Sequence, residues 1–151
     1  IDKCIDYDIV RLLGSPKVNK SKQRKIIKLT DDIYLTRLRT TPGGAHATLI
    51  SRQGAQKLLS ATKTIAFPID TVLGRCWDTG INAYSTWPGL AIQDLTYDSA
   101  IGEDRHDKTV TPKSLSFKLT RAAFKGEEAF GKAYTYYAAR PKDLATRKNF
   151  G

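Results

Sequence analysis

Methionine is absent from this sequence, and cysteine and histidine occur only twice each. Cys4 and Cys76 are too few and too far apart for a disulfide framework or a zinc motif, which leaves free thiols as the simplest interpretation. No apolar run approaches the roughly 18 residues of a membrane-spanning helix, and the first residues do not resemble a signal peptide. Because no Met is present, we expect that Ile1 is not a translation start and that further polypeptide precedes it in the gene.

Self-contained catalytic motifs are also missing. The sequence has no phosphate-binding Gly-rich loop with its Lys, no Gly-x-Ser-x-Gly elbow and no His-Glu-x-x-His. His46, expected within a strand, and His106 have no partners at metal-ligand spacing. Asp31 and Asp32 lie between two short predicted strands and favour a turn over a metal motif, because Asp bonds readily to its own backbone. We therefore predict no metal ligand in this chain.

Acidic residues are scarce, with 15 against 25 basic residues and a net charge of +10. The excess of basic residues is concentrated after residue 104, where the sequence has eleven basic residues and four acidic ones. Such a segment attracts polyanions: nucleic acid, an anionic membrane surface or a phosphorylated glycolipid. Charge alone does not choose among these partners.

The remaining pattern is that of an α/β protein. Strand-like stretches alternate with helix-like ones through residues 7–97, which favours a sheet packed by helices. The expected strands are 7–13, 25–29, 33–39, 45–50, 81–87 and 90–95, with 25–29 and 33–39 forming a hairpin.

Two helices are expected between these strands. The first begins after Ser51, a good N-cap, and contains Gly54 as a weak spot. The second begins at Pro68 and ends near Gly80, with an unbroken apolar stripe along one side.

The last third predicts a basic helical tail. We divide the chain into residues 1–104 and this tail, residues 105–151, with a helix over 115–139 and a loosely ordered end from residue 140. The helix either caps the domain or lies on an anionic membrane with Phe117, Phe124 and Phe130 toward lipid.

Asp70 is the most informative single carboxylate. It lies in the first turn of the second expected helix, about 100° away from the apolar stripe. It either complements the helix dipole or projects into a site at the carboxyl edge of the sheet, where sites of open α/β folds gather. The sequence leaves both interpretations open.

Several blocks together resemble glycosyltransferase family 25, enzymes that add sugars to lipopolysaccharide or lipooligosaccharide. Residues 43–59 are similar to the family's Gly-Thr-x-x-Tyr-hydrophobic-Ile-Ser-Arg-x-x-Ala block, with Thr48 in the place of the Tyr. Residues 67–70, 82–93 and 98–102 follow in the family's order, and residues 7–12 are similar to the strand after its acidic metal motif. The likeness covers about residues 5–105.

The resemblance implies a partial GT-A-like sheet flanked by helices, the acceptor-side part of a hexosyltransferase. Asp70 would be the catalytic carboxylate, and Gly43, Gly44 and Gln93 would bind substrate. The intact enzyme would use a UDP-sugar donor, a glycolipid acceptor and Mn²⁺ or Mg²⁺, at the cytoplasmic face of the inner membrane. The donor and metal-binding half would lie upstream, so we do not expect this chain to be a complete catalyst or to bind the metal by itself.

Two alternatives come from other classes. A basic nucleic-acid-binding module would explain the charge but not the order of the blocks, and it lacks aromatics interleaved with basic residues on a strand. A noncatalytic interaction domain that kept the fold is the other alternative. We expect no specific nucleic-acid partner.

Overall fold

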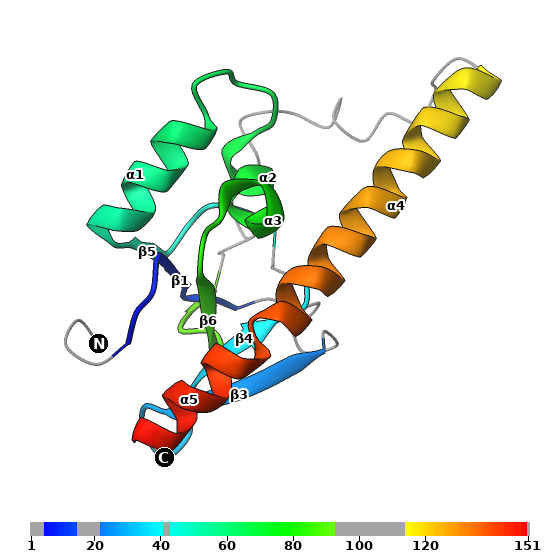
Figure 1. The fold of residues 1–151 in the computed structure, drawn as a ribbon. Coiled ribbons are helices and arrows are strands. Elements are labelled where there is room, and N and C mark those ends of the chain that lie inside the picture. Colours follow the sequence, from blue (N-terminus) through cyan, green and yellow to red (C-terminus); the bar gives the residue numbers. More distant parts are fainter. Residues whose placement is uncertain (1–4, 15–21, 41–42, 93–113, 151) are drawn as a thin grey trace.

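The computed structural model of the chain describes residues 5–14, 22–40, 43–92 and 114–150. Within them, a five-stranded mixed sheet has the strand order β3-β4-β6-β1-β5 (Figure 1). Its members are β1 (Ile9–Arg11), β3 (Gln23–Lys28), β4 (Tyr34–Leu38), β5 (Thr48–Ile50) and β6 (Ala83–Trp87). β1 and β6 run parallel, and the other neighbouring pairs are antiparallel. Two short strands, β2 (Leu13–Gly14) and β7 (Ala91–Ile92), pair in parallel beyond the end of β1.

Each predicted strand overlaps an observed one, and the hairpin is confirmed. The predicted strand 45–50 is extended only at Thr48–Ile50, and residues 93–95 of the last predicted strand lie outside the described residues. β3 and β4 pair with Lys28 opposite Tyr34, and the turn between them contains Asp31 and Asp32. Both carboxylates are exposed, and Lys28 bonds to Asp31 at 2.9 Å. The interpretation of this pair as a turn is therefore correct, and the α/β class is confirmed at the level of a mixed sheet with helices.

The first expected helix is α1 (Arg52–Ala61). Ser51 caps it as predicted, with its hydroxyl accepting a hydrogen bond from the Gly54 N–H at 3.0 Å.

The second expected helix is wrong in one respect, because it is divided into α2 (Ile69–Gly74) and α3 (Cys76–Thr79). Arg75, with φ −92° and ψ 58°, interrupts the helical conformation, and Gly80 ends α3 with a φ of 64°. The Arg75 guanidinium bonds to Asp78 and Glu127 and lies 4.7 Å from the Phe67 ring centre. These tertiary contacts override the continuous apolar stripe.

The core lies on both faces of the sheet. Successive residues of β1 point to opposite faces, so Ile9 packs with Leu58, Val72 and Leu73 of the helices. Val10 packs on the other face, in a cluster with Ile26, Ile27, Leu35 and Tyr84.

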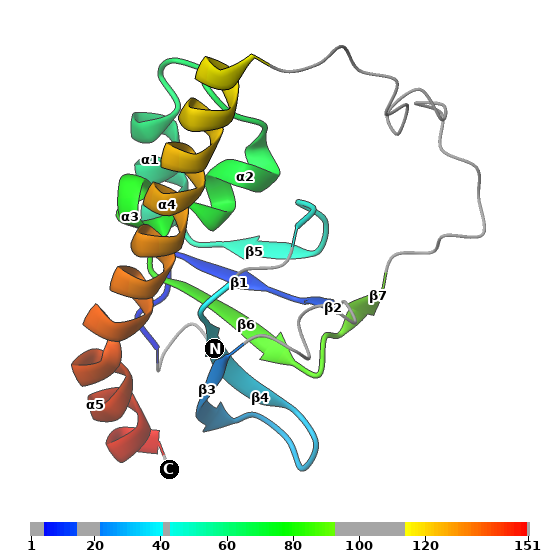
Figure 2. The same cartoon turned by 90° about the vertical axis from the view of Figure 1, so that its right-hand side faces the viewer.

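Two C-terminal helices run along one side of this body, α4 (Leu115–Ala138) and α5 (Arg140–Phe150) (Figure 2). The helix predicted over 115–139 is confirmed, whereas the loosely ordered end predicted from residue 140 is wrong for Arg140–Phe150. α4 packs on α3 where Gly131 faces Trp77: a Cβ on Gly131 would lie 2.3 Å from the indole ring. α5 packs on β3.

A buried charge cluster fixes α5 to the sheet. The Asp143 side chain is fully buried and accepts hydrogen bonds from Arg37 Nε at 2.9 and 3.0 Å and from Arg37 Nη2 at 2.9 Å. Arg24 donates to the same carboxylate and to the Tyr136 carbonyl. Arg37 also donates to the Ala83 carbonyl at 3.0 Å, so the cluster joins β3, β4, β6 and α5. The sequence pattern gave no sign of this buried carboxylate.

Candidate active site

The candidate site lies at the carboxyl end of β1, next to its parallel neighbour β6. Arg11, the last residue of β1, is completely buried and donates a hydrogen bond to the Gly44 carbonyl. One residue further, the Leu12 carbonyl accepts from Leu90 and Ala91, and the Leu12 N–H donates to Ala47. The end of β1 is therefore held between the 43–47 loop and the segment that leads into β7.

The 43–47 loop contains both predicted substrate-binding glycines. Gly44 has a φ of +84°, a conformation that glycine adopts at little cost, and an added Cβ would lie 3.1 Å from His46 Nδ1. Gly43 is exposed, and a Cβ there would meet no atom within 4 Å. Conformation and packing thus explain why glycine occupies position 44, but they do not require glycine at position 43. His46 is exposed and precedes β5, so its expected place within a strand is wrong.

Asp70 lies in the first turn of α2, as predicted, and is partly buried. Its Oδ1 accepts from the Thr71 N–H at 2.8 Å, which satisfies a donor at the start of the helix. Burial lowers the pKa of Arg11, while the negative charge of Asp70 acts in the opposite direction and favours the guanidinium ion. The Asp70 charge therefore acts on Arg11, and the Arg11 guanidinium bonds to Gly44, although Asp70 comes from a helix and Gly44 from a loop.

Gln93, the remaining predicted site residue, lies outside the described residues. It directly follows β7, whose Ala91 pairs with Leu13 of β2.

Two cavities lie close to these elements. The larger, about 470 Å³, is bounded by the end of α1, the 62–68 loop, α2 and α3. Phe67, Ile65 and Ile69 give it apolar walls, and Asp70 is not among its lining residues.

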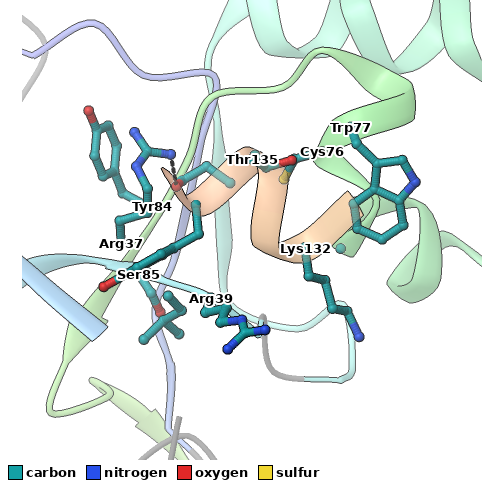
Figure 3. A pocket seen from close by; sticks show the side chains of 12 residues that line it. Arg37, Arg39, Cys76, Trp77, Tyr84, Ser85, Lys132 and Thr135 are labelled. Carbon is teal, nitrogen blue, oxygen red and sulfur yellow. Dashed lines mark hydrogen bonds between the residues drawn. The ribbon is translucent and has the colours of Figure 1, made fainter. Parts of the chain in front are cut away.

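The other cavity is a cleft between α4 and the sheet, with Arg37, Trp77 and Lys132 around it (Figure 3). Its free space of about 20 Å³ has room for about one water molecule, which excludes a sugar or a nucleotide from the cleft in this conformation.

Among the described residues, no group of three or more His, Cys, Asp or Glu side chains comes together as metal ligands. Cys76 packs against the core, and burial raises the pKa of its thiol to about 11. The thiol is therefore neutral near pH 7 and is a poor nucleophile. Asp70 remains the carboxylate whose charge acts on Arg11, the residue that bonds to the 43–47 loop.

Arg11 was not singled out from the sequence as a site residue. It belongs to an expected strand, but its partner Gly44 lies 33 residues away, and only the folded chain brings the two together. The one available signal was a charged residue inside an otherwise apolar strand, at residues 9–13.

Comparison with known proteins gives no match: no protein-family model fits the sequence, and no curated protein or solved structure is significantly similar to it. No helix in the described ranges is long and apolar enough to cross a membrane.

Proposed function

We propose that this chain is the acceptor-side part of a GT-A-like hexosyltransferase that acts on a surface glycolipid at the cytoplasmic face of the inner membrane. The observation that carries the proposal is the hydrogen bond from Arg11 to the Gly44 loop at the carboxyl end of the parallel β1–β6 pair, where the negative charge of Asp70 acts on the same guanidinium. Sites of open α/β folds gather at this edge. The order of the sequence blocks that resemble glycosyltransferase family 25 supports the same assignment.

In this proposal, the Asp70 carboxylate accepts a hydrogen bond from the acceptor hydroxyl and takes its proton as that oxygen attacks the sugar carbon. Thr71 and the start of α2 hold the carboxylate in place. Arg11 acts as a positioning residue, because its hydrogen bond fixes the Gly44 loop against β1. The donor is a UDP-hexose: as the acceptor oxygen bonds to the sugar carbon, the bond from that carbon to the UDP oxygen breaks, and UDP leaves.

Such an enzyme would use a divalent metal, which would supply positive charge to the diphosphate leaving group. The described residues do not form a ligand set for it, so we assign them no part in holding the metal.

The test compares Asp70→Asn with Asp31→Asn, a matched change at an exposed turn. UDP release from a panel of UDP-hexoses, with Mn²⁺ and a lipooligosaccharide acceptor, would be measured on the full-length product of the gene. We expect Asp70→Asn to lower kcat roughly 10²–10⁴-fold, the usual contribution of a general base, and Asp31→Asn to leave it unchanged. Thermal unfolding should be similar in the two variants.

Full activity of the Asp70→Asn enzyme would refute the catalytic assignment. Absence of transfer by the unmodified enzyme, together with salt-sensitive binding to duplex DNA, would favour the nucleic-acid alternative instead.

A further inference from the structure

Helix α4 presents a large apolar surface that the described body of the protein does not cover. Its inward side is identified by three contacts: Phe124 stacks near Phe67 with ring centres 5.9 Å apart, Glu127 pairs with Arg75, and Gly131 faces Trp77. Leu115, Leu119 and Phe130 are 73%, 63% and 73% exposed. At about 100° per residue, Leu115 lies about 160° around the helix from Gly131, and Leu119 and Phe130 lie on its flank, about 120° and 100° from Gly131. Figure 1 shows the first half of α4 projecting away from the sheet.

The apolar surface continues along the helix in a regular stripe. Residues three or four apart share one side of a helix, and the exposed series here is Leu115, Leu119, Ala122, Gly126 and Phe130. The series spans about 22 Å at 1.5 Å per residue. Further along, Tyr137 contacts the body of the protein, because its hydroxyl accepts a hydrogen bond from Lys22 at 2.8 Å. Contiguous exposed apolar surface of this kind marks an interaction site on a folded protein.

A basic stripe lies alongside the apolar one. Lys118, Arg121 and Lys125 are all exposed and lie within about 60° of one another around the helix axis. The acidic residues of α4, Glu127 and Glu128, bond to Arg75 and Lys132. The outward side of the helix is therefore apolar and positively charged.

This charge pattern distinguishes between two possible occupants of the stripe. A second copy of the chain, packed antiparallel on the same stripe, would place basic residues beside their counterparts in the other copy. An anionic lipid surface offers hydrocarbon to the apolar stripe and phosphate groups to the basic one.

We propose that α4 lies flat on an anionic lipid bilayer. Leu115, Leu119 and Phe130 enter the boundary between headgroups and acyl chains, and Lys118, Arg121 and Lys125 contact lipid phosphates. Phe124 is not part of this surface, because its ring faces Phe67 and the Arg75 guanidinium. The predicted lipid-facing set of Phe117, Phe124 and Phe130 is corrected accordingly. The inference depends on α4 alone and is independent of sugar transfer at Asp70.

The test is sedimentation of the chain with vesicles of phosphatidylcholine, with and without phosphatidylglycerol. We expect binding to the anionic vesicles and much weaker binding to the neutral ones. Lys118→Gln/Lys125→Gln should weaken binding about 25-fold, since each basic residue near the surface contributes a factor of about five. Leu119→Ser/Phe130→Ser should weaken it by roughly ten-fold or more.

Matched controls come from α1 and the loop that follows it. Arg52→Gln/Lys63→Gln removes the same charge from exposed positions in and after α1, and Leu59→Ser/Ile65→Ser removes equally exposed apolar groups. Both control variants should bind as the unmodified chain does. Equal binding to neutral and anionic vesicles, or equal losses in the control and α4 variants, would overturn the proposal. So would a stable dimer that Leu119→Ser/Phe130→Ser dissociates without any vesicle binding.

Discussion

Gly54 is the residue at which α1 comes closest to β1. An added Cβ would lie 2.2 Å from the Asp8 carbonyl oxygen, and that same oxygen accepts a hydrogen bond from the Ser51 N–H at 2.9 Å. The backbone at this point has no room to retreat without breaking the helix cap. Glycine has a low helix propensity, so the sequence marks Gly54 as a weak position in α1. The structure shows that only glycine allows the close contact between α1 and the Asp8 backbone.

We expect Gly54→Ala to lower the free energy of unfolding by about 2 kcal/mol or more, through overpacking against the Asp8 backbone. The matched control is Gly126→Ala in α4, where a Cβ meets nothing within 4 Å. That change should raise stability by about 0.5–1 kcal/mol, because alanine loses less backbone entropy in a helix. Guanidinium denaturation of both variants provides the measurement. Equal effects of the two substitutions would show that the Gly54 contact is not tight in solution.

Asp70 and Arg11 show how far residue-level reasoning reaches. The place of Asp70 in the first turn of a helix follows from local signals, namely Pro68 and the apolar residues that come after it. The electrostatic interaction of Asp70 with Arg11 and the hydrogen bond from Arg11 to Gly44 do not, because both depend on how distant segments fold together. Sequence patterns contain no information about such distances.

α5 depends on one buried carboxylate for its attachment to the sheet. Asp143 is the partner of both Arg24 and Arg37, and two of the three side chains are almost completely buried. Removal of one member of such a cluster leaves uncompensated charge in the interior, which is far more costly than the loss of a surface ion pair.

Asp143→Asn should therefore destabilise the protein by about 3–5 kcal/mol. Limited proteolysis should then cut within Arg140–Phe150, because α5 loses its anchor on β3 and β4. Asp31→Asn, which removes an equal charge from an exposed turn, should change stability by less than about 0.5 kcal/mol. An Asp143→Asn protein as stable and as protease-resistant as Asp31→Asn would mean that the apolar contacts of α5 suffice.

The elements differ in how well local pattern defines them. α1 and α4 carry clear signals, with Ser51 and Ser114 as caps and long helical runs after them. The break at Arg75 and the start of α5 have weaker local signals: Gly74 directly precedes the break, and Pro141 stands in the first turn of α5. Ion pairs with distant segments accompany both, Arg75 with Glu127 and Asp143 with Arg24 and Arg37.

At the scale of the whole molecule, residues 114–150 share a core with the sheet. Gly131 packs on Trp77, Tyr136 is buried against Arg24, and Asp143 closes the charge cluster at the other end. Without these helices, Arg37 and Arg24 would lose their carboxylate and Trp77 would face water.

We expect a chain ending at residue 104 to lose its cooperative unfolding transition and most of its near-ultraviolet circular dichroism. The full chain should unfold in a single step. Leu119→Ser/Phe130→Ser should leave that transition nearly unchanged, because both residues lie on the uncovered side of α4. A sharp transition in the shortened chain, at the midpoint of the full one, would identify residues 105–151 as an independent tail.

The sequence by itself determined the α/β class, the strands, the cap of α1, the long basic helix and the place of Asp70 at a helix start. All of these follow from contacts between residues a few positions apart. Only the tertiary structure decided that Arg11 joins the Gly44 loop to β1, that Arg75 divides a helix and that Asp143 holds α5. In each of them a buried guanidinium or carboxylate has a partner far along the chain, and such pairing depends on distances in space that no local pattern specifies.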